Sequence, residues 1–221
     1  MTTLTGARLA PLLDRLFTDA AASSDELNNL LADVPDDEQV RLMRSKTDYI
    51  DLYGRLKAFP LPVSRETGAL LYMLARSSGA RSIVEFGTSF GISTLHLAGA
   101  LRDNGGGRLI GSEFEPSKVA RARANLEAGG LSDLVEIREG DALTTLRTDL
   151  PGTIDLVLLD GAKALYPDVL RLVESRLRPG ALVVADNADD SPEYLAYVRS
   201  AANGYMSVPF AEDVELSMRT C

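Results

Sequence analysis

The sequence predicts an α/β protein built on a Rossmann-like, doubly wound and mostly parallel sheet of seven strands. Three observations lead to this prediction. From residue 81 onward, short apolar segments alternate with segments of helical spacing, as in strand–helix–strand units. Residues 154–159 are apolar almost throughout, which is typical of a central strand covered on both faces. Residues 1–62 show only helical spacing, so a helical N-terminal extension precedes the sheet.

The N-terminal extension should contain several helices. Apolar side chains recur there at helical spacing, and the third run also carries arginines and lysines. Pro60 and Pro62 then interrupt any helix. We therefore expect a boundary at residue 62, with residues 63–221 forming the sheet-containing domain. Helices are expected over 9–17, 27–31, 37–56 and, capped by Ser64, over 64–79.

The second part of the chain supplies the strands and their covering helices. Proline at the start and glycine at the end delimit several of the helical segments. Two alternating segments close the chain and predict an antiparallel hairpin. Strands are expected over 82–86, 108–112, 134–138, 154–159, 181–185, 206–210 and 214–219. Helices are expected over 92–101, 116–128, 167–177 and 192–202.

The composition argues against several classes of binding partner and indicates the cellular compartment. The chain of 221 residues carries a formal net charge of −9, which argues against nucleic acid and anionic membrane surfaces as partners. The single cysteine, Cys221, excludes an intramolecular disulfide and fits a reducing compartment. The sequence lacks the pattern of a signal peptide and has no long apolar stretch, so we expect a cytoplasmic protein.

The first strand runs into a glycine-containing turn, Glu85-Phe-Gly87-Thr-Ser-Phe-Gly91. Its glycines allow a tight turn and a close approach of the backbone to a ligand, and free N–H groups follow at the helix start. A tight turn without a ligand is the alternative. The spacing is Gly-x-x-x-Gly, whereas dinucleotide-binding turns read G-x-G-x-x-G, which counts against NAD and FAD.

Carboxylates follow the second and third strands. Glu113 lies 22 residues after Gly91, close to the spacing at which an acidic residue accepts hydrogen bonds from ribose hydroxyls. Glu115 lies at the start of a helix, where its negative charge interacts favourably with the helix dipole. Asp141 could accept from an adenine amino group or cap the short helix that follows it.

The fourth and fifth strands end in Asp160 and in Asp186-Asn187. Adjacent strand ends bring these residues together, and two carboxylates with an amide oxygen suit Mg²⁺ or Ca²⁺. Lys163 beside a bound cation would have a lowered pKa and could act as a base. The alternatives are helix capping, an Asp–Lys pair and a surface lysine.

The one histidine, His96, lies within a predicted helix. A single histidine excludes a His-based metal site or a Ser-His-Asp triad in one chain. We expect His96 to be a packing or surface residue.

Taken together, these motifs resemble the class I S-adenosylmethionine-dependent O-methyltransferases of the cation-dependent kind, which includes catechol and caffeoyl-CoA O-methyltransferases. The resemblance covers residues 64–219. It rests on five motifs in order: V-E-F-G-T-S-F-G-I-S-T at 84–94, the acid Glu113, G-D-A at 140–142, D-x-x-K at 160–163 and D-N at 186–187.

The resemblance implies roles for these residues. Glu85, Gly87 and Ser93 would lie along the methionine part of the cofactor, with Thr88, Ser89, Gly91 and Asp160 also in the cofactor-binding set. Glu113 would hold the ribose, and Asp141 with Ala142 would border adenine. Asp160, Asp186 and Asn187 would bind a divalent metal, taken as Mg²⁺. Lys163, assisted by Asp160, would deprotonate the acceptor hydroxyl.

The sequence also departs from relatives. Gly161-Ala162 follows Asp160 where relatives carry Ala-Asp, and no residue of 209–214 can be assigned as the carboxylate that holds a second catechol hydroxyl. In relatives, N-terminal helices cover the site or form dimer contacts. The segment 41–62, with Tyr49, Tyr53 and Phe59, is our candidate for a substrate lid; an ordinary packed helix is the alternative.

We therefore predict a metal-dependent methyltransferase, acting as a homodimer on a hydroxyl of a small-molecule acceptor that the sequence does not identify. A metal-independent or nitrogen-directed methyltransferase of the same fold is an alternative. A nicotinamide-dependent oxidoreductase and a non-catalytic cofactor-binding module are further alternatives. The turn spacing disfavours the oxidoreductase, and the intact set of Asp160, Lys163, Asp186 and Asn187 disfavours the module.

Overall fold

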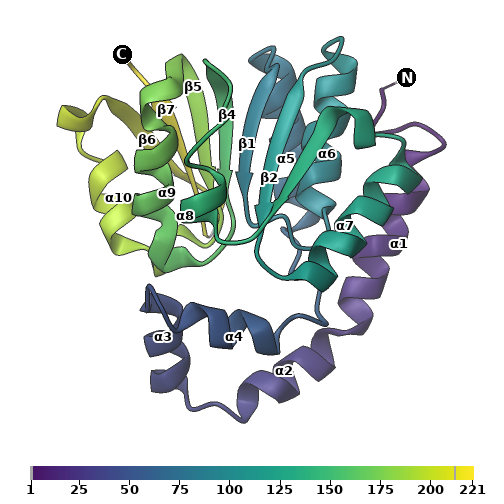
Figure 1. Ribbon diagram of the computed structural model, residues 1–221, viewed down its shortest axis with the longest axis vertical. Coiled ribbons are helices and arrows are strands. Elements are labelled where there is room, and N and C mark those ends of the chain that lie inside the picture. Colours follow the sequence, from purple (N-terminus) through teal and green to yellow (C-terminus); the bar gives the residue numbers. More distant parts are fainter. Residues whose placement is uncertain (1, 212) are drawn as a thin grey trace.

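The apolar segments predicted as strands form one seven-stranded sheet in the order β3-β2-β1-β4-β5-β7-β6 (Figure 1). The computed structural model describes residues 2–211 and 213–221, and the side chain of residue 36 is not described. Strands β1 to β5 are parallel, whereas β7 runs antiparallel to β5 and β6. The predicted fold class is confirmed. The strands are β1 Ser82–Phe86, β2 Arg108–Glu113, β3 Val135–Glu139, β4 Ile154–Leu159, β5 Leu177–Ala185, β6 Tyr205–Phe210 and β7 Val214–Arg219.

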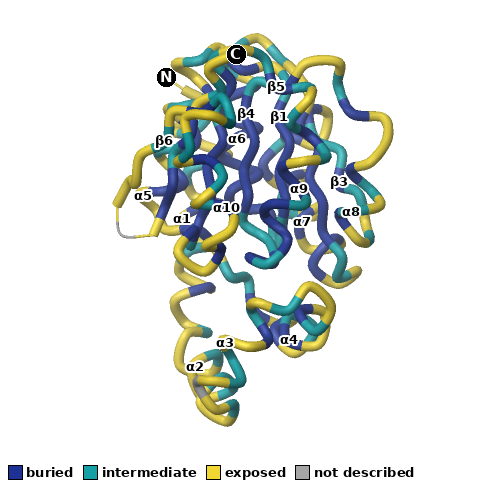
Figure 2. Tube along the Cα trace, turned by 90° about the vertical axis from the view of Figure 1, so that its left-hand side faces the viewer, coloured by how far each residue is buried: buried dark blue, intermediate teal, exposed yellow. Residues whose placement is uncertain are grey.

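Helices cover both faces of the sheet, as a doubly wound topology requires. Neighbouring residues of β1 serve opposite faces: Ile83 packs with α1, α5, α6 and α7, and Val84 packs with α8, α9 and α10. Figure 2 shows the strands buried along most of their length. The helices are α1 Leu9–Ala22, α2 Ser24–Ala32, α3 Asp36–Arg44, α4 Tyr49–Arg55, α5 Arg65–Ser77, α6 Ile92–Asp103, α7 Pro116–Gly129, α8 Ala142–Thr145, α9 Tyr166–Val173 and α10 Pro192–Val198.

The N-terminal helices fall into two groups. Helix α1 packs its buried leucines into the cluster under the sheet. Helices α2, α3 and α4 form a separate cluster around Leu42, Leu52, Leu56 and Phe59. They lie across the end of the sheet in Figure 1, and none of the residues of α2 is fully buried. We refer to residues 24–62, which include the predicted lid segment 41–62, as the lid; its role in covering a substrate stays a prediction.

The third predicted helical run is wrong as one helix. Helix α3 ends at Arg44 and α4 begins at Tyr49, and between them Ser45 takes an extended conformation. The Ser45 hydroxyl accepts hydrogen bonds from the N–H groups of Thr47 and Asp48, at 3.3 and 2.9 Å. This local bonding satisfies backbone groups that a continuous helix would have used.

Strand β5 begins earlier than its sequence predicts. Proline and glycine at 179–180 indicated a turn, but they lie within the strand, and helix α9 ends at Val173 instead of Leu177. The pairing explains this, because Ile154 faces Leu177 while Leu156 faces Leu182. The additional residues of β5 form a bulge, which accommodates Pro179 without breaking the sheet. Helix α10 likewise ends at Val198, short of the predicted 202.

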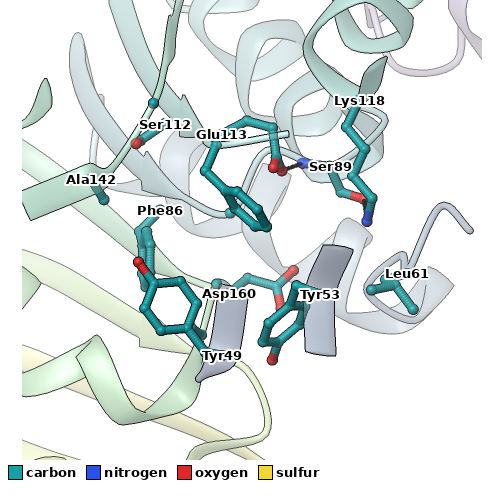
Figure 3. Close-up of a pocket in the computed structure, with 15 residues that line it drawn as sticks. Tyr49, Tyr53, Leu61, Phe86, Ser89, Ser112, Glu113, Lys118, Ala142 and Asp160 are labelled. Carbon is teal, nitrogen blue, oxygen red and sulfur yellow. Dashed lines mark hydrogen bonds between the residues drawn. The ribbon is translucent and has the colours of Figure 1, made fainter. Parts of the chain in front are cut away.

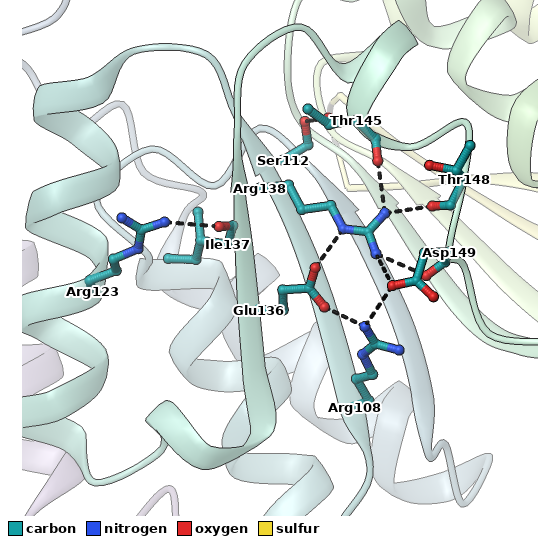
Figure 4. A network of polar contacts seen from close by, with 9 residues as sticks. All are labelled: Arg108, Ser112, Arg123, Glu136, Ile137, Arg138, Thr145, Thr148 and Asp149. Atoms are coloured by element: carbon teal, nitrogen blue, oxygen red, sulfur yellow. Dashed lines mark hydrogen bonds and ion pairs between the residues drawn. The ribbon is translucent and has the colours of Figure 1, made fainter.

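An arginine network fixes the segment that follows β3 (Figure 4). Arg138 donates to the carbonyl oxygens of Thr145, Thr148 and Asp149 at 2.7–2.8 Å and to Glu136 at 2.7 Å. These bonds hold the turn around α8 against the edge of the sheet, which fixes the position of Ala142 at the strand ends. Among the described residues, no helix combines the length and apolar character needed to cross a membrane.

Candidate active site

Two cavities lie at the carboxyl ends of the parallel strands, between the sheet and the lid. The first has a volume of about 560 Å³, including the part that is open to solvent (Figure 3). The loops after β1, β2, β3 and β4 supply most of its wall, and the lid supplies Tyr49, Tyr53 and Leu61. Open α/β sheets bind their ligands at this edge. Of the predicted cofactor-binding residues, Gly87, Ser89, Glu113, Ala142 and Asp160 line it.

Glu85 lies beneath this cavity and does not line it. Its carboxylate is fully buried and accepts hydrogen bonds from three hydroxyls: Thr88 at 3.0 Å, Ser93 at 2.7 Å and Thr94 at 2.6 Å. Burial raises the pKa of Glu85, and the three hydroxyls oppose that rise. The structure thus uses Glu85, Thr88 and Ser93 to hold the glycine turn in place.

The turn itself requires glycine at two positions. Gly87 has φ +97°, and a Cβ atom there would lie 2.4 Å from the carbonyl oxygen of Asp160. Gly91 also has a positive φ and precedes α6. Between them, Ser89 takes φ +47°, which directs its N–H to a Glu113 oxygen at 2.8 Å and its hydroxyl to the carbonyl oxygen of Pro60.

Glu113 faces the first cavity with acceptor capacity to spare. Its two oxygens each accept one backbone N–H, from Ser89 and from Glu115 at 3.0 Å. A carboxylate has about four lone-pair sites, so it can accept further bonds from a ligand. Asp141 is exposed and caps α8 by accepting from the N–H of Leu143 at 2.9 Å, while Ala142 lines the cavity. Phe114 and Tyr49 meet edge to face across it.

The second cavity has a volume of about 1200 Å³, including the part that is open to solvent, and holds the predicted acidic set. Asp160 lines both cavities. Lys163 donates to Asp160 Oδ1 at 3.2 Å and to the Tyr166 hydroxyl at 2.9 Å, and that hydroxyl donates to the carbonyl oxygen of Asp186 at 2.7 Å. No role was predicted for Tyr166, and its only signal in the sequence is its spacing of three residues from Lys163.

The two aspartates carry raised pKa values. Burial, opposed by Lys163, raises the pKa of Asp160 to about 6. Burial and the negative charge of Asp160 raise the pKa of Asp186 to about 7. Although burial lowers it, the pKa of Lys163 is raised well above its ordinary value by Tyr166 and Asp160. Lys163 in this structure is therefore an ammonium group.

Asp186 and Asn187 offer oxygen ligands to the second cavity. No hydrogen bond reaches the Asp186 carboxylate in the described part of the chain. Asn187 takes φ +48°, and its amide nitrogen donates to Asp213 Oδ2 at 2.8 Å, which leaves its amide oxygen available. With Asp160 they make three hard oxygen donors, which fits a divalent cation such as Mg²⁺. The described residues contain no group of three or more Asp, Glu, His or Cys side chains that could hold a metal by themselves.

Tyr53 and Leu61 of the lid line both cavities, together with Asp160. The two cavities therefore meet at these three residues. Phe59, the third lid aromatic noted in the sequence, lies in the lid's own cluster. Lys118, which the sequence analysis did not single out, lines the first cavity from the start of α7.

His96 is a packing residue, as predicted. It is buried in α6, its Nδ1 lies 2.8 Å from the carbonyl oxygen of Ile92, and its ring meets Phe17 edge to face. Burial lowers the pKa of His96.

Known proteins with similar sequences are methyltransferases. A family model described as a methyltransferase domain matches residues 84–188, a range that contains every site residue predicted from the sequence. Nearly half of the chain thus resembles a methyltransferase domain. The resemblance to S-adenosylmethionine-dependent O-methyltransferases is confirmed by individual relatives. A catechol O-methyltransferase of Niastella koreensis is 38% identical over 130 residues, covering 58% of this chain and 58% of that protein.

A catechol O-methyltransferase of Mycobacterium tuberculosis is 36% identical over 127 residues, covering 58% of this chain and 57% of that protein. The solved structure of the O-methyltransferase TomG from Streptomyces achromogenes, involved in tomaymycin synthesis and bound to S-adenosylmethionine, superposes with a TM-score of 0.65 at 27% identity. It covers 85% of this chain and 92% of that chain. The chain spans less than three fifths of each of these two curated relatives, and the match to the methyltransferase domain model leaves the lid outside it.

Proposed function

We propose that this protein transfers a methyl group from S-adenosylmethionine to a hydroxyl group of a small-molecule acceptor. The observation that carries the proposal is the meeting of two cavities at Tyr53, Leu61 and Asp160. Methyl transfer needs a cofactor and an acceptor held end to end, with the reacting atoms in contact, and much of the rate comes from that positioning. The names of the curated relatives and the bound cofactor of TomG support the choice of reaction.

The first cavity would hold the cofactor. Glu113 would accept hydrogen bonds from the ribose hydroxyls, as its spare lone pairs allow. Ala142 and Phe114 would flank adenine, with Tyr49 on the lid side. Gly87 would let the methionine part pass close to the backbone, since the space of its missing side chain is bounded by Asp160. Glu85, Thr88 and Ser93 would act from below by fixing that turn.

The second cavity would hold the acceptor next to Asp160, Asp186 and Asn187. We infer that these residues bind a divalent cation, taken as Mg²⁺. Such a cation lowers the pKa of a bound hydroxyl and orients it. Lys163 would then take the hydroxyl proton. In the present structure Asp160 and Tyr166 hold Lys163 as an ammonium, so Lys163 would act as a base only after giving one proton to water. A cation held by Asp160 would weaken the Asp160–Lys163 ion pair and so favour that loss.

Calorimetric titration with S-adenosylhomocysteine tests the cofactor claim. We expect micromolar binding that Glu113→Gln weakens and that Glu139→Gln, an exposed neighbour outside the cavity, leaves unchanged. Addition of a catechol should release heat only with Mg²⁺ present, and EDTA should abolish that signal. No binding of S-adenosylhomocysteine would contradict the proposed function. Cofactor binding with catechol binding that ignores EDTA would leave a metal-independent methyltransferase.

The metal-independent alternative has one observation in its favour. Asp160 and Lys163 already form an ion pair at 3.2 Å, so this part of the site is complete without a cation. A nitrogen acceptor would also fit such a site. The predicted homodimer and cytoplasmic location stay predictions, and sedimentation of the purified chain at several concentrations measures the first.

A further inference from the structure

The second cavity has walls of two chemical kinds, and they restrict the acceptor. One wall consists of apolar lid side chains, and the other consists of polar and charged groups from the strand ends. Leu27, Leu31, Met43 and Leu61 are only partly buried in the lid's own cluster and line the cavity. The opposite wall carries the four carboxylates of Asp160, Asp186, Asp190 and Asp213.

The charged wall is negative with or without a metal. Lys163 is the one cationic side chain among the described residues that line this cavity, and it is engaged by Asp160 and Tyr166. A divalent cation on Asp160 and Asp186 would still leave Asp190 and Asp213 facing the cavity. An acceptor with a carboxylate or phosphate would meet like charge, which is unfavourable at close range.

The apolar wall favours an acceptor that carries an apolar group. Partly buried leucines and a methionine face this cavity, and apolar surface in contact with water is unfavourable. A hydroxylated ring alone would leave most of this wall uncovered. An apolar substituent on the ring would cover it while the hydroxyl stays near Asp160.

We propose that the acceptor is a neutral or cationic hydroxylated aromatic compound with an apolar substituent, and that anionic acceptors are rejected. This inference rests on the proposed function. It differs from that function because the site could methylate catechols without either preference.

The test uses catechols with alkyl chains of two, four and six carbons at C4, and chains of equal length that end in a carboxylate, an amide or an ammonium. Methylation rates give kcat/KM for each. We expect about a threefold gain for each added methylene and at least a tenfold disadvantage of the carboxylate against the amide. Equal rates for carboxylate and amide, or no effect of chain length, would overturn the inference and leave the methyltransferase function standing.

Matched variants test which residues cause each preference. Asp190→Asn with Asp213→Asn should reduce the disadvantage of the carboxylate, whereas Asp189→Asn, an exposed neighbour that does not line the cavity, should not. Leu31→Ala should flatten the dependence on chain length. Leu30→Ala, on the same helix but outside the cavity wall, is its control. If both members of a pair behave alike, the cavity is not the acceptor site.

A second, independent observation concerns Lys118, which is 4% exposed and lines the first cavity. Figure 3 shows its side chain running down to Ser89 beside Leu61. Its ammonium makes one hydrogen bond, to Ser89 Oγ at 3.2 Å. Among the described residues, no carboxylate lies within ion-pair distance of it. Two of its three N–H donors are left for a ligand.

This position is costly for a cation. Burial lowers the pKa of Lys118, although Glu113, Asp160 and Glu115 attract its charge. The residue also lies in the first turn of α7, where the helix dipole is positive. A buried, weakly paired cation at such a place gains most from an anionic ligand. The cofactor proposed for this cavity has one anionic group, the carboxylate of its methionine part.

We propose that Lys118 binds the cofactor carboxylate. This too rests on the proposed function. The test compares S-adenosylhomocysteine with its decarboxylated analogue, which keeps the amine and lacks only the carboxylate. Lys118→Met should weaken binding of S-adenosylhomocysteine about 10- to 100-fold and change binding of the analogue less than threefold.

Two further variants complete this test. Lys118→Arg should restore most of the affinity. Arg121→Met is the control, because Arg121 lies on the same helix over the same Phe90 ring but does not line the cavity. An equal loss for both ligands, or no loss for either, would overturn the assignment. If the unmodified protein bound the analogue and S-adenosylhomocysteine equally well, the cavity would have no carboxylate site and the assignment would fail while cofactor binding stood.

Discussion

The two cavities of this protein differ in how their polar groups are satisfied. On the cofactor side, Glu85 is bound by three hydroxyls and Glu113 by two backbone N–H groups. On the acceptor side, the Asp186 carboxylate has no partner among the described residues, and its pKa is raised to about 7 by burial and by Asp160. The first region is thus organised before any ligand arrives. The second contains a buried carboxylate, that of Asp186, without a hydrogen-bond partner among the described residues.

The source of each wall explains this difference. The cofactor cavity is shaped mainly by backbone turns at strand ends, where neighbouring strands leave little freedom. The acceptor cavity is closed by side chains of a lid that has its own small apolar cluster. Binding in the second region should therefore respond to single charges and to lid contacts. Four predictions test this comparison, from the largest expected effect to the smallest.

Lys163→Met should lower kcat about 10³-fold, because general-base catalysis contributes roughly 10²- to 10⁴-fold. The dissociation constant of S-adenosylhomocysteine should stay within a factor of three, since Lys163 does not line the cofactor cavity. Steady-state rates and calorimetry measure the two effects. Lys57→Met, an exposed lid lysine, is the control. Unchanged turnover would remove Lys163 from the reaction.

Gly87→Ala should cost about 3 kcal/mol of unfolding free energy, because it combines a positive φ with a Cβ atom 2.4 Å from a backbone oxygen. Gly54→Ala is the matched control, since nothing lies within 4 Å of its Cβ position in α4 and alanine favours a helix. Urea unfolding should show a loss for the first and a small gain for the second. Tolerance of alanine at Gly87 would mean that the cofactor turn is not rigid.

Asp186→Asn should stabilise the metal-free protein at pH 8 by about 1–3 kcal/mol. The folded-state pKa of about 7 lies above the ordinary value of 3.8, so the folded protein binds the extra proton between these values. The unfolding free energy of the unmodified protein should then fall as pH rises from about 4 to 7, and the variant should flatten that slope. Denaturant titrations across this range check the sign.

Mg²⁺ provides the second arm of that experiment. At pH 8 it should raise the melting temperature of the unmodified protein and have little effect on Asp186→Asn. An equal effect on both proteins would remove Asp186 from the proposed metal set.

Lys46→Ala should have the smallest effect. Lys46 joins the lid to the start of α9 through Asp168 at 2.6 Å, but its side chain is half exposed. Exposed ion pairs contribute roughly 0.2–1 kcal/mol, so acceptor KM should rise about two- to threefold with kcat unchanged. High salt should erase the difference between variant and unmodified protein. A tenfold effect would show that the lid depends on this one contact.

Much of the fold was predictable because its signals are local. Apolar segments located all seven strands, although β5 begins earlier than predicted, and Ser64 caps α5 through its hydroxyl as expected. The bulge at Pro179 was not predictable, because only pairing with β4 shows that the chain continues as a strand. The break at Ser45 was missed for a related reason: its hydroxyl competes with the helix, and propensity alone does not reveal that.

The candidate site divides in the same way. Residues at strand ends, such as Glu113 and Asp160, were found because topology places them at one edge. Lys118 and Tyr166 were missed because their importance depends on burial and on partners far along the chain. The resemblance also places Glu85 along the cofactor, and that role stays a prediction; in this structure its carboxylate accepts three hydroxyls beneath the turn. Residue type and spacing do not reveal how a buried carboxylate divides its hydrogen bonds.

Ser89 has a consequence for the order of events. Its N–H donates to Glu113, and its hydroxyl donates to the carbonyl oxygen of Pro60, in the last residues of the lid. A ligand that favours one arrangement of Glu113 and Ser89 must also bias the position of that segment. By thermodynamic reciprocity, an acceptor held by the lid changes cofactor affinity by the same factor as the cofactor changes acceptor affinity. The Ser89 hydroxyl thereby couples binding of the acceptor to binding of the cofactor.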